Sequence, residues 1–248
     1  MYSSSSRCNI ASSGRHAPYY SRLVGMAVCF LLIIGANRTV FAADIDAARE
    51  QFKTGQYDQC FESAKKAIDD GAYSVEWRIL MIETLLATGR YDQAVEDMDI
   101  ALLNYPVSMR LLELGHRVYL HRIEPSRAED VLKRLARVGT GRDLRFLSPT
   151  DLVALGKALL LLGEEPRLVL DQIFNRALKN DPNCLEAYLA AGDLALAKQD
   201  YELAADQYRN ALKRFGKDPD AHYGLARAFY PSDRRSMVES LDAALHVN

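Results

Sequence analysis

Residues 89–102 read GRYDQAVEDMDIAL, and residues 55–68 read GQYDQCFESAKKAI. A third copy, QDYELAADQYRNAL, stands at residues 199–212. Each copy carries two small residues spaced seven positions apart: Cys60 and Ala67, Ala94 and Ala101, Ala204 and Ala211. The second small residue and its aliphatic neighbour recur twice more, at Ala177-Leu178 and Ala244-Leu245. Small residues at this spacing form one stripe of a helix and let a neighbouring helix approach closely.

The start of each copy predicts a turn between two helices. Gly55 and Gly89 suit the left-handed residue that ends a helix. The acid that follows each tyrosine then falls in the first turn of the next helix, near its positive end. We expect the tyrosine to fill the corner between the two helices. Pro106 and Pro182 end their units, because proline cannot continue a helix.

This pattern resembles the tetratricopeptide repeat, a helix–turn–helix unit of about 34 residues. The pairs that match the Leu-Gly of its first helix are Leu114-Gly115, Leu155-Gly156, Ala191-Gly192 and Leu225-Ala226. The resemblance implies an all-α fold, a right-handed superhelical solenoid of antiparallel helix pairs. About six units start near residues 41, 75, 108, 149, 185 and 219, and together they cover residues 43–248.

Two units depart from the pattern. Unit three has Arg122-Ile123-Glu124-Pro125 where the turn is expected, and unit four has two extra residues between Gly163 and Ala177. An insertion at residues 139–149 separates these two units. Insertions often map to a functional face of a repeat array, but long surface loops also cost little free energy.

The first 42 residues have the pattern of an export signal. Four arginines and no acid lie in this segment, and residues 23–36 read LVGMAVCFLLIIGA. Fourteen apolar residues are short for a bilayer span of about 20 residues and fit a secretory signal. We predict cleavage after Ala42 or one residue later; the alternative is an uncleaved anchor that faces the periplasm. Val28 before Cys29 argues against lipid attachment.

Composition limits the kinds of partner. The chain has 248 residues and a formal net charge of −2. Without the four signal arginines, 27 basic and 33 acidic residues remain, so the body is acidic and a poor nucleic-acid binder. Only Cys60 and Cys184 remain in the body, and both are expected to be buried thiols.

No catalytic motif, phosphate loop or dinucleotide turn is found, so we predict neither an enzyme nor a cofactor. A metal site is not predicted, because His116 and His121 are five residues apart and lie off a common helical face. The repeat tyrosines, Tyr57, Tyr91, Tyr188, Tyr201, Tyr208 and Tyr223, are assigned mainly to the core.

In the tetratricopeptide family the first helices line a concave groove, and residues five and nine of each unit point into it. Carried over, residue nine gives a candidate partner-binding set of Arg49, Glu83, His116, Lys157, Asp193 and Arg227. Residue five gives Ile45, Ile79, Leu112, Val153, Leu189 and Tyr223. The lysines and asparagines with which some relatives clamp a terminal carboxylate are absent from these positions.

The signal pattern predicts an exported bacterial protein, periplasmic or extracellular, and the resemblance implies that it binds a protein partner in its groove without catalysis. The alternative is the amino-terminal part of a larger exported protein, with an enzymatic or anchoring domain beyond residue 248. Val238, Leu241 and Leu245 recur at helical spacing near the end of the sequence. We expect them to leave an exposed apolar patch that favours self-association.

Overall fold

The computed structural model describes residues 45–246, which form helices and turns without a strand among them. The predicted export signal lies outside these residues. Residues 45–53 are helical. The helices that follow are α2 (Tyr57–Asp69), α3 (Val75–Ala87), α4 (Tyr91–Asn104), α5 (Met109–His121), α6 (Pro125–Thr140), α7 (Pro149–Leu161), α8 (Pro166–Val169), α9 (Asn175–Asn180), α10 (Leu185–Ala197), α11 (Tyr201–Phe215), α12 (Pro219–Phe229) and α13 (Arg234–Leu245).

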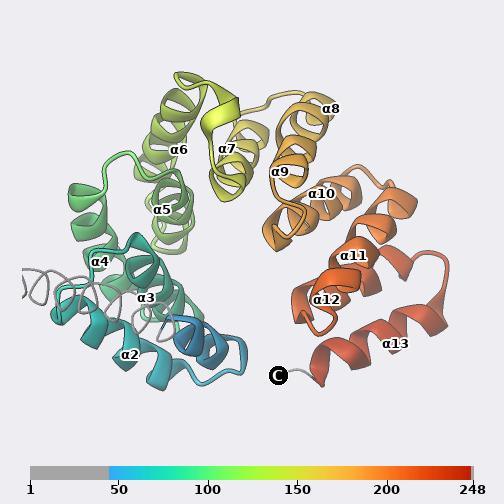
Figure 1. Ribbon diagram of the computed structural model, residues 1–248, viewed down its shortest axis with the longest axis horizontal. Helices are drawn as coiled ribbons and strands as arrows, with labels where there is room; N and C mark the ends of the chain where they lie inside the picture. Colours follow the sequence, from blue (N-terminus) through green and yellow to red (C-terminus); the bar gives the residue numbers. More distant parts are fainter. Residues whose placement is uncertain (1–44, 247–248) are drawn as a thin grey trace, which may run out of the picture. The chain divides into compact units, whose positions relative to one another are not determined.

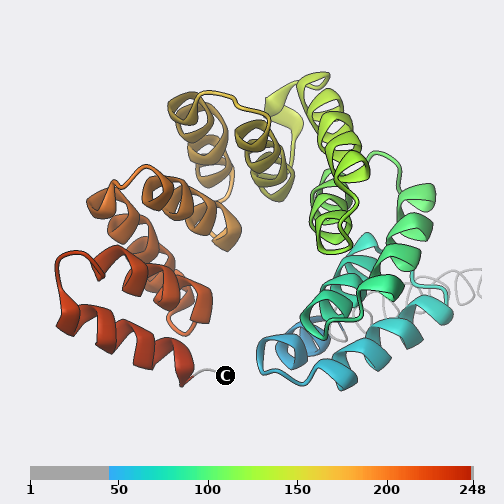
Figure 2. The ribbon, with the colours of Figure 1, turned by 180° about the vertical axis from the view of Figure 1, so that it is seen from behind.

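Successive helices pair and the pairs stack in sequence order (Figures 1 and 2). The six pairs of the described region are 45–53 with α2, α3 with α4, α5 with α6, α7 with α8–α9, α10 with α11, and α12 with α13. From unit two on, the first helices begin within one residue of the starts predicted from the repeat. The predicted all-α solenoid of helix pairs is therefore confirmed.

One backbone turn joins the two helices of a unit. In unit two, Gly89 has a φ of 72°, and the next amide, of Arg90, donates a 2.8 Å hydrogen bond to the Leu85 carbonyl. The same bond recurs in unit three, where Glu124 donates to Tyr119 at 2.8 Å. There the left-handed residue is Ile123, with a φ of 63°. Unit three therefore has the same turn geometry as unit two, although isoleucine disfavours a positive φ.

The small residues lie between helices, as predicted. Ala94, Ala101, Ala204 and Ala211 are fully buried. Cys60 and Cys184 are buried free thiols, which confirms their assignment as small core residues. Ala67 is only half-buried.

The assignment of the repeat tyrosines to the core is largely wrong. Tyr188 and Tyr208 are buried, but Tyr91, Tyr201 and Tyr223 expose 37%, 38% and 53% of their surface. Tyr91 begins the second helix of its unit, and its ring stacks on that of His121, with centroids 5.1 Å apart. The tyrosine at the corner therefore covers the end of the next unit's first helix and keeps one face in water.

The two extra residues of unit four are absorbed in two places. One lengthens the turn, because the second helix begins at Pro166, three residues after Gly163, whereas α4 begins two residues after Gly89. The other forms a π-helical turn at Leu170–Phe174, between α8 and α9. A π-turn holds one extra residue without ending the helix, so Ala177 still reaches a fully buried position.

The insertion is shorter than predicted, because α6 continues through Gly139 and Thr140. The rest contains a 3-10 turn at Leu144–Phe146. Asp143 caps this turn by accepting the Arg145 amide at 2.9 Å. Hydrogen bonds from Arg145 lower the pKa of the Asp143 carboxyl to about 2. Phe146 is 84% exposed.

Candidate functional site

A groove of about 600 Å³ is lined mainly by first helices, from residues 45–53 through α12. Its residues recur at fixed places, counted from the first residue of each helix. Place two gives Glu76, Arg110, Thr150, Glu186 and Asp220, and place five gives Ile79, Glu113, Val153, Leu189 and, beside the main groove, Tyr223. The groove thus has an apolar floor interrupted by charged side chains.

Place nine holds four residues of the predicted partner-binding set: Glu83, Lys157, Asp193 and Arg227. Arg49, Glu83 and Lys157 line the main groove, and Asp193 and Arg227 line a continuous pocket beside Lys157. The structure thus brings five of the six predicted residues to one face. Whether they bind a partner stays a prediction.

His116 is the exception, because its unit begins one residue later than predicted. Ser108 caps α5, and its hydroxyl accepts the Leu111 amide, so Met109 is the first helical residue. Arg117 therefore takes the place assigned to His116. The His116 ring lies 3.1 Å from the Ala128 carbonyl, toward the second helix of its own unit.

Because α5 begins one residue later than predicted, the prediction that Leu112 lines the groove at residue five of unit three is also wrong. Leu112 is fully buried in the core rather than in the groove. Glu113 lines the groove in its place. Ile45 packs against the core from the first described helix.

Charged groove residues pair between neighbouring units. Glu76 accepts Arg49 at 2.7 Å and also pairs with Arg110, so one carboxylate joins three consecutive first helices. Glu83 lies 3.8 Å from Arg117. Two further pairs join Glu113 to Lys157 at 3.9 Å and Asp193 to Arg227 at 3.2 Å. These pairs hold the charges in set places along the groove.

The carboxyl of Glu83 is affected both by burial and by neighbouring arginines. Burial against the floor raises the pKa of its carboxyl above the usual range, and Arg117 and Arg110 oppose that shift. Desolvation disfavours the ionised form, whereas a nearby cation favours it. Burial and the two arginines therefore act in opposite directions on the pKa of the Glu83 carboxyl.

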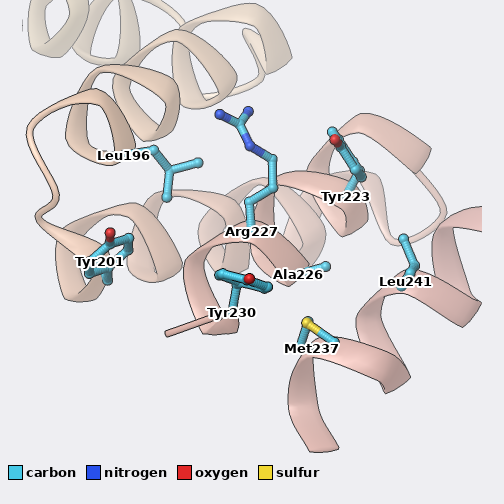
Figure 3. A pocket seen from close by; sticks show the side chains of 8 residues that line it. All are labelled: Leu196, Tyr201, Tyr223, Ala226, Arg227, Tyr230, Met237 and Leu241. Atoms are coloured by element: carbon cyan, nitrogen blue, oxygen red, sulfur yellow. The ribbon is translucent and has the colours of Figure 1, made fainter. Parts of the chain in front are cut away.

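A second cavity of about 400 Å³ opens near the carboxyl end (Figure 3). Side chains from α10 to α13 converge on it: Leu196, Tyr201, Tyr223, Ala226, Arg227, Tyr230, Met237 and Leu241. Sequence reasoning missed this cavity, because it forms only where two consecutive units meet. The sequence feature that could have indicated the cavity is the seven-residue spacing of Tyr223, in α12, and Tyr230, directly after α12.

The described residues hold no cluster of three or more histidine, cysteine or acidic side chains that is able to ligate a metal. In the same region, no helix has both the length and the apolar character needed to cross a bilayer.

A sequence model of the tetratricopeptide repeat matches residues 171–209 and 189–245. These stretches extend from the π-turn of unit four to the end of α13. No curated protein sequence matches the chain.

Three solved structures share the fold. TTC0263, a thermophilic TPR protein of Thermus thermophilus, has a TM-score of 0.55 at 20% identity, over 76% of this chain and 98% of that one. The human IFIT1 dimer with PPP-AAAA has a TM-score of 0.56 at 12% identity, over 76% and 45%. The APC/C hetero-tetramer Cut9-Hcn1 has a TM-score of 0.54 at 12% identity, over 84% and 40%.

Proposed function

We propose that this chain, a tetratricopeptide-repeat protein by its family match and its fold, is a non-catalytic scaffold or adaptor. It binds a peptide or a helix of a partner protein in the groove of its first helices. The observation that carries the proposal is the groove itself, in which an apolar floor alternates with charges at repeating places. Proteins of this family act generally as interaction scaffolds without catalysis.

The shape and chemistry of the groove support a peptide or helix as its occupant. Val153 and Leu189 offer apolar contacts along the floor, and Arg117 and Lys157 offer donors at its wall. Extended peptides and amphipathic helices are recognised by such a combination of apolar pockets and polar contacts. A small-molecule enzyme site would instead need a convergent catalytic set, which the sequence does not provide.

We further propose that the protein acts after export, in the periplasm or outside the cell. The support is the amino-terminal sequence, with its arginines, short apolar run and small residues before the expected cleavage point. Partners are then envelope or extracellular proteins. Amino-terminal sequencing of the protein from its native host tests this, with Ala43 or Asp44 as the expected first residue. An intact Met1 in a soluble cytoplasmic fraction would refute export.

Affinity capture from envelope extract tests the groove as the binding surface. The bait is residues 43–248, compared with a double variant that reverses two groove charges, Arg117→Glu and Lys157→Glu. The matched control reverses two exposed charges on second helices, Lys65→Glu and Lys179→Glu.

We expect a partner that the wild-type chain and the control capture equally and the groove variant loses. Circular dichroism of each variant checks that helicity is retained. Equal capture by all three baits would place the partner on another surface and refute groove binding.

A further inference from the structure

The two ends of the described repeat array face each other across the groove. Phe52 and Lys53 of the first described helix, residues 45–53, line the groove together with Phe215 and Asp220. A neighbouring cleft of about 620 Å³ also has both ends in its wall. Its lining includes Glu50, Lys53, Thr54, Lys217, His222 and Ala243. The first described helix, drawn in blue, accordingly faces α12 and α13 in Figures 1 and 2.

The two sides of this cleft are not bonded to each other. Among the residues that the structure describes, no hydrogen bond or ion pair joins residues 45–54 to residues 215–246. Each unit of a solenoid contacts mainly its neighbours, so the spacing of the two ends is the sum of small rotations between units. Small shifts at several unit boundaries therefore suffice to open or close the cleft.

The charges on the two sides are complementary. The first described helix presents Glu50 and Lys53 three residues apart, and the opposite side presents Lys217 and Asp220. Burial and neighbouring acids raise the pKa of Asp220, and Lys53 opposes that shift. Lys53 is therefore near enough to act on this carboxylate. The two side chains do not yet form an ion pair, because no such pair within 4.0 Å is found for either of them among the described residues.

The neighbouring charges have other partners. Arg49, the other cation of the first described helix, pairs with Glu76 at 2.7 Å. Asp218, which directly precedes α12, is buried and caps that helix. Lys53 and Asp220 are both exposed, so closure of the cleft brings these two charges together without breaking an existing pair.

We propose that the first described helix is a latch on the groove. When the two ends close around a bound segment, Lys53 pairs with Asp220, and Glu50 faces Lys217 at the outer edge. The inference rests on the proposed function, because it names how the groove admits and keeps its segment. An exposed ion pair changes an equilibrium only a few-fold, so the latch is reversible. The segment enters while the ends are apart and is held while they are together.

Cross-linking without a partner tests the latch. Residues 43–248 carry Thr54→Cys and Ala243→Cys, which replace uncharged residues on opposite sides of the cleft. The native Cys60 and Cys184 are buried, so a short bis-maleimide reacts with the introduced pair. The rate of bridging, followed by mobility on a denaturing gel, reports how often the two ends approach.

Charge reversal on one side should separate the ends. We expect Asp220→Lys to slow bridging about threefold, as for an exposed ion pair, and the further change Lys53→Asp to restore the rate. Sodium chloride at about 1 M should also slow bridging, because it screens charges more than about 3 Å apart. Asp130→Lys, which reverses an exposed acid on α6, is the matched control and should leave the rate unchanged. Absence of bridging, or equal rates in the reversed and the swapped chains, would overturn the latch.

Capture from envelope extract connects the latch with binding. A bait that is bridged before the extract is added should lose the groove-dependent partner. The same bait with both cysteines blocked by N-ethylmaleimide should keep it. Equal capture of that partner by the two baits would overturn the latch and leave groove binding intact. If the wild-type chain captures no partner, the proposed function fails, and the bridging rates still decide whether the latch exists.

Discussion

The Tyr208 hydroxyl donates a 2.9 Å hydrogen bond to the Asp193 carboxylate. The Tyr208 ring lies between two glycines of consecutive first helices, Gly192 and Gly224. Asp193 also accepts Arg227 at 3.2 Å. One buried tyrosine of a second helix therefore joins its own unit to the next and orients a pair of groove charges.

Because the Tyr208 ring lies against both glycines, neither position has room for the methyl group of an alanine. A Cβ at Gly192 would come within 2.6 Å of Tyr208 Cζ, and one at Gly224 would clash with the same ring. We expect Gly192→Ala and Gly224→Ala each to lower the free energy of unfolding by about 1–2 kcal/mol through overpacking. Alanine would otherwise favour a helix by about 1 kcal/mol. Urea denaturation followed by circular dichroism measures the change. Gly216→Ala, where a Cβ meets only ordinary contacts, is the control and should be near neutral.

The turn of unit three predicts a stabilising substitution. Ile123 is 86% exposed, so its side chain contributes little packing, yet its φ of 63° is unfavourable for a β-branched residue. We expect Ile123→Gly to raise the free energy of unfolding by about 1 kcal/mol. The reciprocal change, Gly89→Ile at the same turn of unit two, should destabilise by a similar or larger amount. Thermal melts of the two variants beside the wild-type chain measure both effects. A destabilised Ile123→Gly variant would mean that the isoleucine side chain makes an important contact.

Ala204 tests the close approach of helices that the repeat implies. It is fully buried in α11, close to α10, so a larger side chain has no free space. Replacement with leucine should destabilise by about 1–3 kcal/mol through overpacking. Ala47→Leu, at an exposed position of the first described helix, should leave the melting temperature unchanged. If both variants melt at the wild-type temperature, Ala204 is not closely packed between α11 and α10.

The sequence predicted the helix pairs well, because the seven-residue spacing of small residues reports directly on helix packing. It placed the groove residues correctly wherever the start of the first helix was correct. Unit three shows the limit of that reasoning. The repeat pattern starts unit three at Ser108, but serine favours the capping position, and this one-residue shift puts Arg117 rather than His116 in the groove.

Other features could not be read from one sequence. Two extra residues before Ala177 are compatible with a longer turn or with a bulged helix. The structure shows one residue in the turn and the other in the π-turn of the second helix. The ion pair between Glu83 and Arg117 likewise depends on which residues of neighbouring units face each other. Such contacts between units are set by the superhelical path, which the repeat pattern does not specify.

Burial of the two body cysteines predicts slow thiol chemistry and a pH dependence. Desolvation raises the pKa of both thiols, that of Cys184 to about 11 from an ordinary 9.0. An aromatic disulfide reagent should therefore leave both unmodified in the folded chain at about pH 8, and react with both after unfolding in urea. Because the folded chain binds more protons between pH 9.0 and about 11, its free energy of unfolding should fall as pH rises through that window. Cys184→Ala should remove part of this fall. Rapid labelling of Cys184 without denaturant would contradict its burial.

The apolar stripe predicted on the last helix is exposed, and the repeat shows what such a stripe usually contacts. Val238, Leu241 and Leu245 of α13 correspond to Ala205, Tyr208 and Leu212 of α11. The first two of those are buried, in part under α12, and Leu212 is half-buried. Leu245, by contrast, is 64% exposed.

We expect this exposed stripe to drive self-association of residues 43–248, because contact with another surface removes apolar side chains from water. Sedimentation across a concentration series should show a shift from monomer to a larger species. Val238→Lys with Leu245→Lys should abolish that shift and change the free energy of unfolding by no more than about 0.5 kcal/mol per site, as usual for exposed positions. As a matched control, Leu103→Lys, which charges an exposed leucine on α4, should leave the association unchanged. If the chain stays monomeric at every concentration, with or without these substitutions, the exposed stripe of α13 does not drive self-association.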